Sequence, residues 1–430
     1  MTPAVSLTQG MILKGKNPKI TLLGNNSGRN LGDAAILSSI LEHLTRELPD
    51  AEFYVPSIKP KWIEKHYGAR YRVRAVNVLP WTFSLRLLGI PTIRCFAKSD
   101  VALICDGIIF GKNLLNPAFN YLITLVFLLP FAKLFKCKLV CFNNGIGPFP
   151  SKLSEHCARW VINSCETISM REEDSIELAR KIGVTKTIDI SGDSAFINPV
   201  SSRSRAEEIA SKEGILLSAP MLGVNVTKYI DSWLSEDRRI EDKSRFLDTL
   251  AEGLNQFKAG LKNTAQVVVF STQPMDESFS ETLAKKISAV TIDNTRYLSH
   301  DVQAIMRECD LLVGMRFHAL VLASAVDVPI VGLVYAPKVR SLMKLLKSEQ
   351  FSLELKELNS ESLAKALHLA WSERESLGVK QQEIVKQCKI GARRAGEELR
   401  KRFFPGINEL QKSKVVSLHQ SPRSAVNETR

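Results

Sequence analysis

Short apolar runs alternate with helical stretches in both halves of this chain, and several of the runs are followed by loops that contain glycine. Apolar runs without polar alternation are typical of strands buried on both faces, as in parallel sheets covered by helices. The predicted strands are 20–23, 101–105, 139–142, 167–170 and 187–190 in the first half, and 222–226, 266–271, 290–292, 310–313 and 330–334 in the second. The pattern predicts an α/β fold with two Rossmann-like domains facing a cleft, where ligands bind at the carboxyl ends of the strands.

The length of the chain also favours two domains. At 430 residues it exceeds what one core usually serves, because single cores stop growing at about 250 to 300 residues. A polar, strandless stretch separates the two sets of strands. We predict an N-terminal α/β domain (17–199), a linker (200–214), a C-terminal α/β domain (215–360), C-terminal helices (361–405) and a disordered basic tail (406–430).

The charge balance restricts the class of partner. Lysine and arginine outnumber aspartate and glutamate by 58 to 45, which gives a formal net charge of +13. Such an excess predicts attraction to an acidic partner. The sequence has no zinc-finger or RNA-recognition signature and no basic helix interleaved with aromatic residues, so nucleic acid is not expected. An anionic membrane face and an acidic glycan remain.

The cysteines and the N-terminus indicate the compartment. The eight cysteines are scattered through apolar segments without a Cys-x-x-Cys pair, which is typical of buried thiols in a reducing environment. The first residues lack the apolar core of a secretory signal. We therefore predict a cytoplasmic protein. The apolar stretch 121–132 is too short to span a bilayer and is interrupted by Pro130, so a buried helix is favoured over a shallow membrane-facing one.

Arg316 and His318 lie two residues apart where a predicted strand ends and a helix begins. Free N–H groups at a helix start favour an anion, and an arginine fork holds a carboxylate or phosphate bidentately. A histidine beside such an anion can give or take a proton near neutral pH. The alternative is an arginine in an ion pair at a domain interface and a partly buried, satisfied histidine.

Four further side chains near strand ends are candidates, and each also has an ordinary structural explanation. Arg171 opens the sequence REED and can pair with Glu173 or Asp174. Asp33 stands where an N-cap belongs, and Asp106 can bind loop amides. Lys338 can be a solvated turn residue.

Six ordered motifs resemble the polysaccharide pyruvyl transferase family, which moves a pyruvyl group from phosphoenolpyruvate onto sugars of cell-surface glycans. The motifs are GNNSGRNLGDAAIL (24–37), NNGIGPF (143–149), SMREEDSIELARKIGV (169–184), SGDSAF (191–196), LGVNV (222–226) and GMRFHALVLASAVDVPIVGLVYAPKV (314–339). The chain departs from the family pattern at Asp106, where a further glycine is usual, and at Ser194, where a proline is usual.

The resemblance implies a fold like the B-type glycosyltransferases, with the acceptor on the side of the N-terminal domain and the donor on the other. It also implies phosphoenolpyruvate as donor and a glycan or lipid-linked oligosaccharide as acceptor, with possible peripheral association with the inner membrane face. The donor-binding residues expected on this basis are Arg171, Arg316, His318 and Lys338. His318 is expected as proton donor or phosphate-side acid, and Asp33 or Asp106 as the group that activates the acceptor hydroxyl. The acceptor-side loops are expected to contribute Asn26, Gly32, Asp33, Asn144 and Gly145.

Several other chemistries are not expected. The sequence has no Asp-x-Asp pair, no His/Cys cluster with ligand spacing, no phosphate loop and no dinucleotide fingerprint, so we expect neither a metal nor a cofactor. Two other functions stay open. One is a B-type glycosyltransferase that uses a nucleotide sugar, and the other is a non-catalytic, membrane-associated scaffold.

Overall fold

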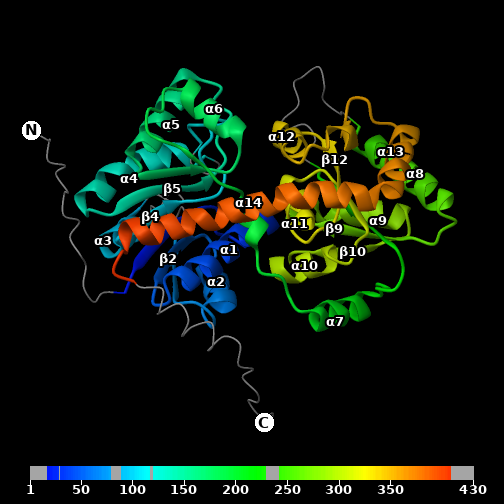
Figure 1. Ribbon diagram of the computed structural model, residues 1–430, viewed down its shortest axis with the longest axis horizontal. Helices are drawn as coiled ribbons and strands as arrows, with labels where there is room; N and C mark the ends of the chain where they lie inside the picture. Colours follow the sequence, from blue (N-terminus) through cyan, green and yellow to red (C-terminus); the bar gives the residue numbers. More distant parts are fainter. Residues whose placement is uncertain (1–16, 29, 79–88, 117–119, 229–241, 408–430) are drawn as a thin grey trace, which may run out of the picture.

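The structure is a computed structural model that describes residues 17–28, 30–78, 89–116, 120–228 and 242–407. It contains two parallel sheets, one in each half of the chain (Figure 1). The first sheet has seven strands in the order β3-β2-β1-β4-β5-β6-β7 and the second has six in the order β10-β9-β8-β11-β12-β13. Every strand pair is parallel, so helices must connect the strands.

The strands of the first sheet are β1 (Lys19–Leu23), β2 (Glu52–Ser57), β3 (Val73–Asn77), β4 (Val101–Ile104), β5 (Lys138–Asn144), β6 (Thr167–Met170) and β7 (Asp189–Ile190). Those of the second are β8 (Met221–Asn225), β9 (Gln266–Ser271), β10 (Val290–Asp293), β11 (Leu311–Gly314), β12 (Ile330–Val334) and β13 (Ser352–Glu354). The predicted fold class is confirmed, and each predicted strand is present to within two residues at either end.

The helices of the first half are α1 (Leu31–Glu47), α2 (Pro60–Tyr67), α3 (Ile90–Lys98), α4 (Leu122–Leu134), α5 (Lys152–Ser164) and α6 (Glu173–Lys181). Those that follow are α7 (Arg203–Glu213), α8 (Lys243–Gly260), α9 (Glu277–Lys286), α10 (Ser299–Met306), α11 (Phe317–Ser324), α12 (Pro337–Leu345), α13 (Ser360–Ser372) and α14 (Arg374–Phe403). Most of the segment predicted as a linker, 200–214, forms α7, which packs against α10. The proposed domain boundaries stay a prediction.

Three strands were not predicted. The edge strands β3 and β13 are only half-buried, so their sequences, VRAVN and SLE, lack a continuous apolar run. Strand β2 is buried, but its sequence EFYVPS contains Pro56, a residue that is rare in strands inside a sheet. Apart from β6, the remaining central strands are almost fully buried, and all four residues of β4 are at most 1% exposed.

Helix α14 connects the two halves. It starts beside α13 in the C-terminal half and runs back to pack on α1 and β5 of the N-terminal half (Figure 1). Two polar contacts fix its end. The backbone carbonyl of Arg393 lies 2.7 Å from Nε2 of His43, and Arg400 Nε donates to Glu47 Oε2 at 3.1 Å. The C-terminal helix therefore belongs to the core of both halves.

Helix α4 has features of both alternatives considered for residues 121–132, a buried helix and a membrane-facing one. Its inner face, including Leu122, Leu125 and Leu128, is buried against the first sheet, which confirms a packed helix. Phe127 and Leu134 on its outer face are 58% and 69% exposed. In the described part of the chain, no helix combines the length and apolarity needed to cross a bilayer.

Candidate functional site

The predicted site residues come from loops at the carboxyl ends of neighbouring strands. Strands β1, β4, β5 and β6 are adjacent in the first sheet, so the segments that follow them reach the same edge. The second sheet contributes the starts of α11 and α12, which follow β11 and β12. These two edges meet between the halves of the protein.

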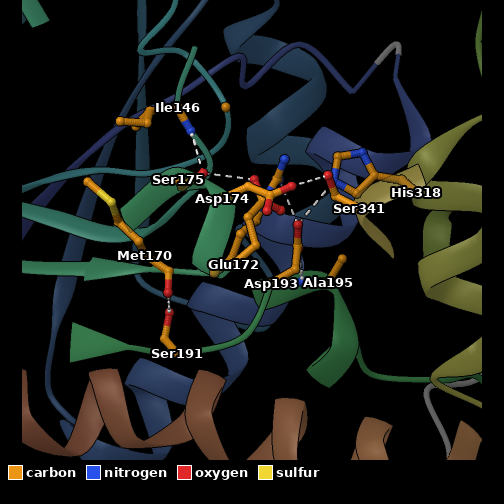
Figure 2. A network of polar contacts seen from close by, with 12 residues as sticks. Ile146, Met170, Glu172, Asp174, Ser175, Ser191, Asp193, Ala195, His318 and Ser341 are labelled. Carbon is orange, nitrogen blue, oxygen red and sulfur yellow. Dashed lines mark hydrogen bonds and ion pairs between the residues drawn. The ribbon is translucent and has the colours of Figure 1, made fainter. Parts of the chain in front are cut away.

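His318, near the start of α11, reaches across to the N-terminal half. Its Nε2 lies 3.5 Å from Oδ2 of Asp193, an ion-pair distance too long for a normal hydrogen bond (Figure 2). Nε2 is buried and makes no hydrogen bond with any residue that the structure describes. On the other side of the ring, a Cβ placed on Gly32 would lie only 2.0 Å from Nδ1. The ring is thus held between α1 and Asp193, and its Nε2 has no close hydrogen-bond partner among the described residues.

Arg171 and Asp193 form a buried ion pair beside this histidine. Arg171 donates from one terminal nitrogen to Asp193 Oδ2 at 2.7 Å and from Nε to Glu172 Oε2 at 3.1 Å. The two paired side chains, Arg171 and Asp193, are only 9% and 3% exposed. The guanidinium also stacks over the ring of Phe317 at 4.6 Å. Arg171 therefore pairs with Glu172 and with the more distant Asp193, not with Glu173 or Asp174.

The pKa values of this pair reflect competition between burial and charge. Burial would raise the pKa of Asp193, but Arg171 and His318 outweigh it and hold this pKa well below its usual range. Burial would lower the pKa of Arg171, and Glu172 and Asp193 raise it instead. Asp193 also accepts a hydrogen bond from the backbone N–H of Ala195 at 2.8 Å. Both groups stay charged over the whole physiological range.

Asp33 and Asp106 form a second cluster, in which two carboxyl groups share a hydrogen bond. Burial, followed by the charge and hydrogen bond of Asp106, raises the pKa of Asp33 well above its usual value, against opposing effects of Asn25 and Lys338. Asn25 donates to Asp33, and Tyr121 donates to Asn25 Oδ1 at 3.0 Å. Asp33 therefore keeps a proton to higher pH than an exposed aspartate does, which suits a proton donor.

The capping explanation for Asp33 is wrong. Asn30 is the N-cap of α1, and its side chain accepts a hydrogen bond from the backbone N–H of Gly32 at 2.9 Å. Asp33 is the third residue of the helix and points its carboxyl group at Asp106. Asp106 does bind a loop amide, because its Oδ1 accepts from its neighbour Gly107 at 2.6 Å. Its φ of 69° is strained for a residue with a side chain, a feature that clusters at functional sites.

Arg316 is the N-cap residue of α11, and its guanidinium faces Asp276. Its Nε donates to Asp276 Oδ2 at 2.6 Å, and Asp276 is fully buried. The hydroxyl of Thr227 and the backbone N–H of Lys228 also donate to Asp276, at 3.0 and 3.1 Å. The ion-pair alternative is thus correct for Arg316, although the pair lies within the C-terminal half.

The structure brings most of the other predicted residues together. Lys338 is the second residue of α12, is half-buried, and lies close enough to Asp33 to lower its pKa. Gly145 packs against Arg171, since a Cβ there would lie 2.5 Å from the guanidinium. Asn26 and Asn144 are turned inward instead, and their side-chain amides donate to the backbone carbonyls of Leu22 and Ile104. Those two residues hold their loops in place.

Several functional partners were missed by sequence reasoning. Asp276 and Tyr121 gave no motif signal, because each acts through a contact with a residue far away in the chain. Asp193 entered the sequence analysis only within the motif SGDSAF, and its ion pair with Arg171 spans 22 positions. Asn25 adjoins the predicted Asn26, and the polar loop GNNSG marked the region without distinguishing the two.

The two halves are in contact over this site. Ser341 of α12 donates to Asp174 of α6 (Figure 2), and the backbone N–H of Leu31 donates to the carbonyl of Thr272 at 2.9 Å. One cavity here, lined by Arg171, Phe317 and neighbouring side chains, has a volume of about 10 Å³. That is room for about one water. The described residues contain no cluster of three or more His, Cys, Asp or Glu side chains that could hold a metal ion.

Comparisons with known proteins agree with this architecture. A family model described as polysaccharide pyruvyl transferase matches residues 30–337. The amylovoran biosynthesis protein AmsJ of Erwinia amylovora is 22% identical, over 80% of this chain and 90% of that protein. Among solved structures, the UDP-GlcNAc 2-epimerase of Neisseria meningitidis superposes with a TM-score of 0.55 at 10% identity, covering 89% of this chain and 98% of the epimerase. The epimerase of Methanocaldococcus jannaschii gives 0.53 at 12% identity, covering 87% of this chain and 99% of its own. At such identities these likenesses concern the fold alone, and they agree with the B-type glycosyltransferase architecture that was expected.

Proposed function

The chain belongs to the polysaccharide pyruvyl transferase family, and from this we propose that it transfers a pyruvyl group from phosphoenolpyruvate to a sugar of a polysaccharide or its lipid-linked precursor. As a member of this family it is a transferase of polysaccharide biosynthesis. The proposed product is a pyruvate ketal, with inorganic phosphate released. We also propose that the reaction takes place in the cytoplasm, with a lipid-linked acceptor at the inner membrane face.

One observation above all supports this chemistry. The carboxyl group of Asp33, whose pKa is raised by burial and by Asp106, shares a hydrogen bond with Asp106 and lies within electrostatic range of a cation, Lys338. A proton donor, a proton acceptor and an anion-binding group thus meet at one point between the halves. A ketal-forming transfer from phosphoenolpyruvate needs these three kinds of group.

The reaction balances with these groups. A proton is added to the methylene carbon of phosphoenolpyruvate, which becomes a methyl group and leaves an oxocarbenium-like centre at the neighbouring carbon. One sugar hydroxyl attacks that carbon, the bond to phosphate breaks, and a second hydroxyl of the same sugar closes the ketal. Of the two hydroxyl protons, one replaces the proton used on carbon and the other leaves with phosphate.

The proposed roles follow from the geometry. Arg316 and Lys338 bind the carboxylate and phosphate of the donor, and His318 acts on the phosphate side, since its Nε2 makes no polar contact among the described residues closer than the 3.5 Å ion pair with Asp193. Arg171 binds two carboxylates, Asp193 and Glu172, whereas Arg316 binds one, Asp276, so we assign Arg171 the smaller share of donor binding. Asp33 and Asp106 move protons between the donor and the acceptor hydroxyls.

Calorimetric titration of phosphoenolpyruvate tests the donor assignment. Because hydrogen bonds to charged groups contribute about 1.5 to 3 kcal/mol, we expect Arg316→Ala to weaken binding at least about tenfold. Arg316→Lys keeps a charge beside the buried Asp276 but loses the planar fork, so we expect it to weaken donor binding with little loss of thermal stability. Arg340→Ala on α12, from an exposed pair with Glu354, serves as the control and should bind as the wild type does.

The same titration separates the proposal from its alternative. Tight binding of a nucleotide sugar, with no heat from phosphoenolpyruvate, would support the alternative function, a glycosyltransferase that uses a nucleotide sugar. Equal binding of phosphoenolpyruvate by the wild type and both Arg316 variants would remove Arg316 from the donor site.

Gly32→Ala tests whether the position of His318 matters. The added methyl group would lie 2.0 Å from Nδ1, so the ring must move. Displacing a reacting group by about 1 Å costs on the order of a hundredfold in rate, and we expect kcat to fall by about that factor. Gly378→Ala on α14 is the matched control, because its new Cβ meets only Pro329 Cδ at 3.9 Å. Wild-type turnover by Gly32→Ala would show that the histidine is not needed where it lies.

A further inference from the structure

Half of the exposed large hydrophobic side chains lie in one region of the molecule. Of the fourteen that are exposed among the described residues, seven fall between Ile90 and Trp160. This region comprises α3, α4 and α5, which lie together toward the left of the view in Figure 1. Scattered exposed apolar residues are normal on a protein surface, but a concentration over neighbouring helices calls for a partner.

The exposed side chains share one surface. On α4, Phe127 and Leu134 lie seven residues apart, and the same spacing separates Leu153 and Trp160 on α5. Two turns of helix bring such residues to the same side. Helices α4 and α5 pack directly against each other on one side of the first sheet, so their outer faces are continuous. We call this surface, with Leu115 beside it, the α4–α5 face.

A shallow depression borders this face near the candidate site. It has a volume of about 950 Å³, and Leu115 and Leu153 both line it. Both of these side chains are well exposed, at 78% and 54%. The depression starts at Gly111, five residues after Asp106, on the loop that leaves β4. The depression and Asp106 therefore belong to the same loop after β4.

The charges around this face favour an anionic bilayer over a protein as its binding partner. Between Ile90 and Ser164 the chain carries eight lysine and arginine residues against three acidic ones, a formal excess of five positive charges. Lys133 and Lys136 flank the exposed Leu134, and Lys152 adjoins Leu153, and all three lysines are exposed. A protein partner would need an acidic and apolar surface of matching shape. An anionic bilayer supplies both properties without a specific shape, because lysine stems lie along acyl chains while their amines reach the headgroups.

We propose that the α4–α5 face docks on an anionic membrane, with Trp160, Leu153 and Phe127 entering the headgroup region. Docking there places the Gly111 depression at the lipid surface. Tyr121, the N-cap residue of α4, links this helix to the site through its hydrogen bond to Asn25 at 3.0 Å. That an acceptor sugar carried on a lipid would enter along this edge rests on the proposed function, whereas membrane docking itself does not.

Flotation with lipid vesicles tests the proposal. The wild type should bind vesicles of phosphatidylcholine mixed with phosphatidylglycerol, should bind pure phosphatidylcholine weakly, and should be released as salt is added. Because each large apolar side chain contributes about 1.5 to 3 kcal/mol when fully buried, we expect Leu153→Ser with Trp160→Ser to weaken binding at least about tenfold. The control pair, Leu369→Ser with Val379→Ser, is similarly exposed at 49% and 69% in the C-terminal half and should bind as the wild type does.

Two outcomes would overturn docking. One is equal vesicle binding by the wild type and the Leu153/Trp160 variant, with both thermally stable. The other is a wild-type dimer in sedimentation analysis that the same variant converts to a monomer, which would make this face a contact between copies. Phosphoenolpyruvate titration of the same samples keeps the two proposals separate, since loss of vesicle binding should leave donor binding unchanged and failure of donor binding leaves the vesicle result intact.

Discussion

His318→Ala is expected to lower kcat by about 10² to 10⁴-fold while leaving the affinity for phosphoenolpyruvate within a few-fold of the wild type. General acid–base groups contribute factors of this size to turnover. Donor affinity should survive, because in this proposal Arg316 and Lys338 supply the main anion contacts. Single-turnover kinetics beside calorimetry measures the two quantities separately.

The appropriate control for His318→Ala is another histidine. His156 on α5 is exposed, and its ring contacts only Arg159 of the same helix among the described residues. His156→Ala should leave both kcat and affinity unchanged. If His318→Ala instead weakens donor binding while kcat persists, the histidine binds the donor and the proton must come from elsewhere, with Asp33 the first candidate.

Most strands could be predicted from the sequence, because the strands of a parallel sheet are buried on both faces and therefore form continuous apolar runs. Strand β9 (QVVVFS) and strand β12 (IVGLV) are continuous apolar runs, and both were predicted at their observed bounds. The edge strand β3 has one face toward solvent, so its sequence VRAVN alternates with charge and resembles a loop. Burial gives a strand its apolar run, which the edge strand β3 lacks. The edge strands β7 and β10 were still predicted, from the apolar residues of TIDI (187–190) and VTI (290–292).

The site was predictable only one residue at a time. The spacing of Arg316 and His318 depends on local structure, which sequence pattern reports well. The hydrogen bond between Asp33 and Asp106 joins positions 73 residues apart, and the ion pair of Arg316 with Asp276 spans 40. Such pairings depend on strand order in the sheets, which no local pattern contains. Individual candidates were therefore recognised, while the partners that set their protonation were not.

Asp193→Ala is expected to lower the free energy of unfolding by about 3 to 5 kcal/mol, the usual cost of leaving one member of a buried ion pair behind. Arg171 would remain buried with Glu172 as its remaining carboxylate partner among the described residues, and the N–H of Ala195 would lose its acceptor. Glu354→Ala breaks an exposed pair with Arg340 and should cost less than about 1 kcal/mol. Urea unfolding of the three proteins at neutral pH gives the comparison.

The pH dependence of stability and a double variant show whether the lost stability comes from the ion pair between Arg171 and Asp193. The pKa of Asp193 is depressed in the folded protein, so its stabilisation is present above the ordinary aspartate pKa and is lost as pH falls below it. The gap between the wild type and Asp193→Ala should therefore narrow below about pH 4. Arg171→Met combined with Asp193→Leu removes both charges and should recover much of the stability that Asp193→Ala loses, because neither member of the buried pair is left alone and Glu172, 18% exposed, keeps its hydrogen bond from Ser175. The loss of stability could instead be independent of pH and persist in the double variant. Asp193 would then stabilise the fold through the Ala195 hydrogen bond and packing, and its ion pair with Arg171 would contribute nothing.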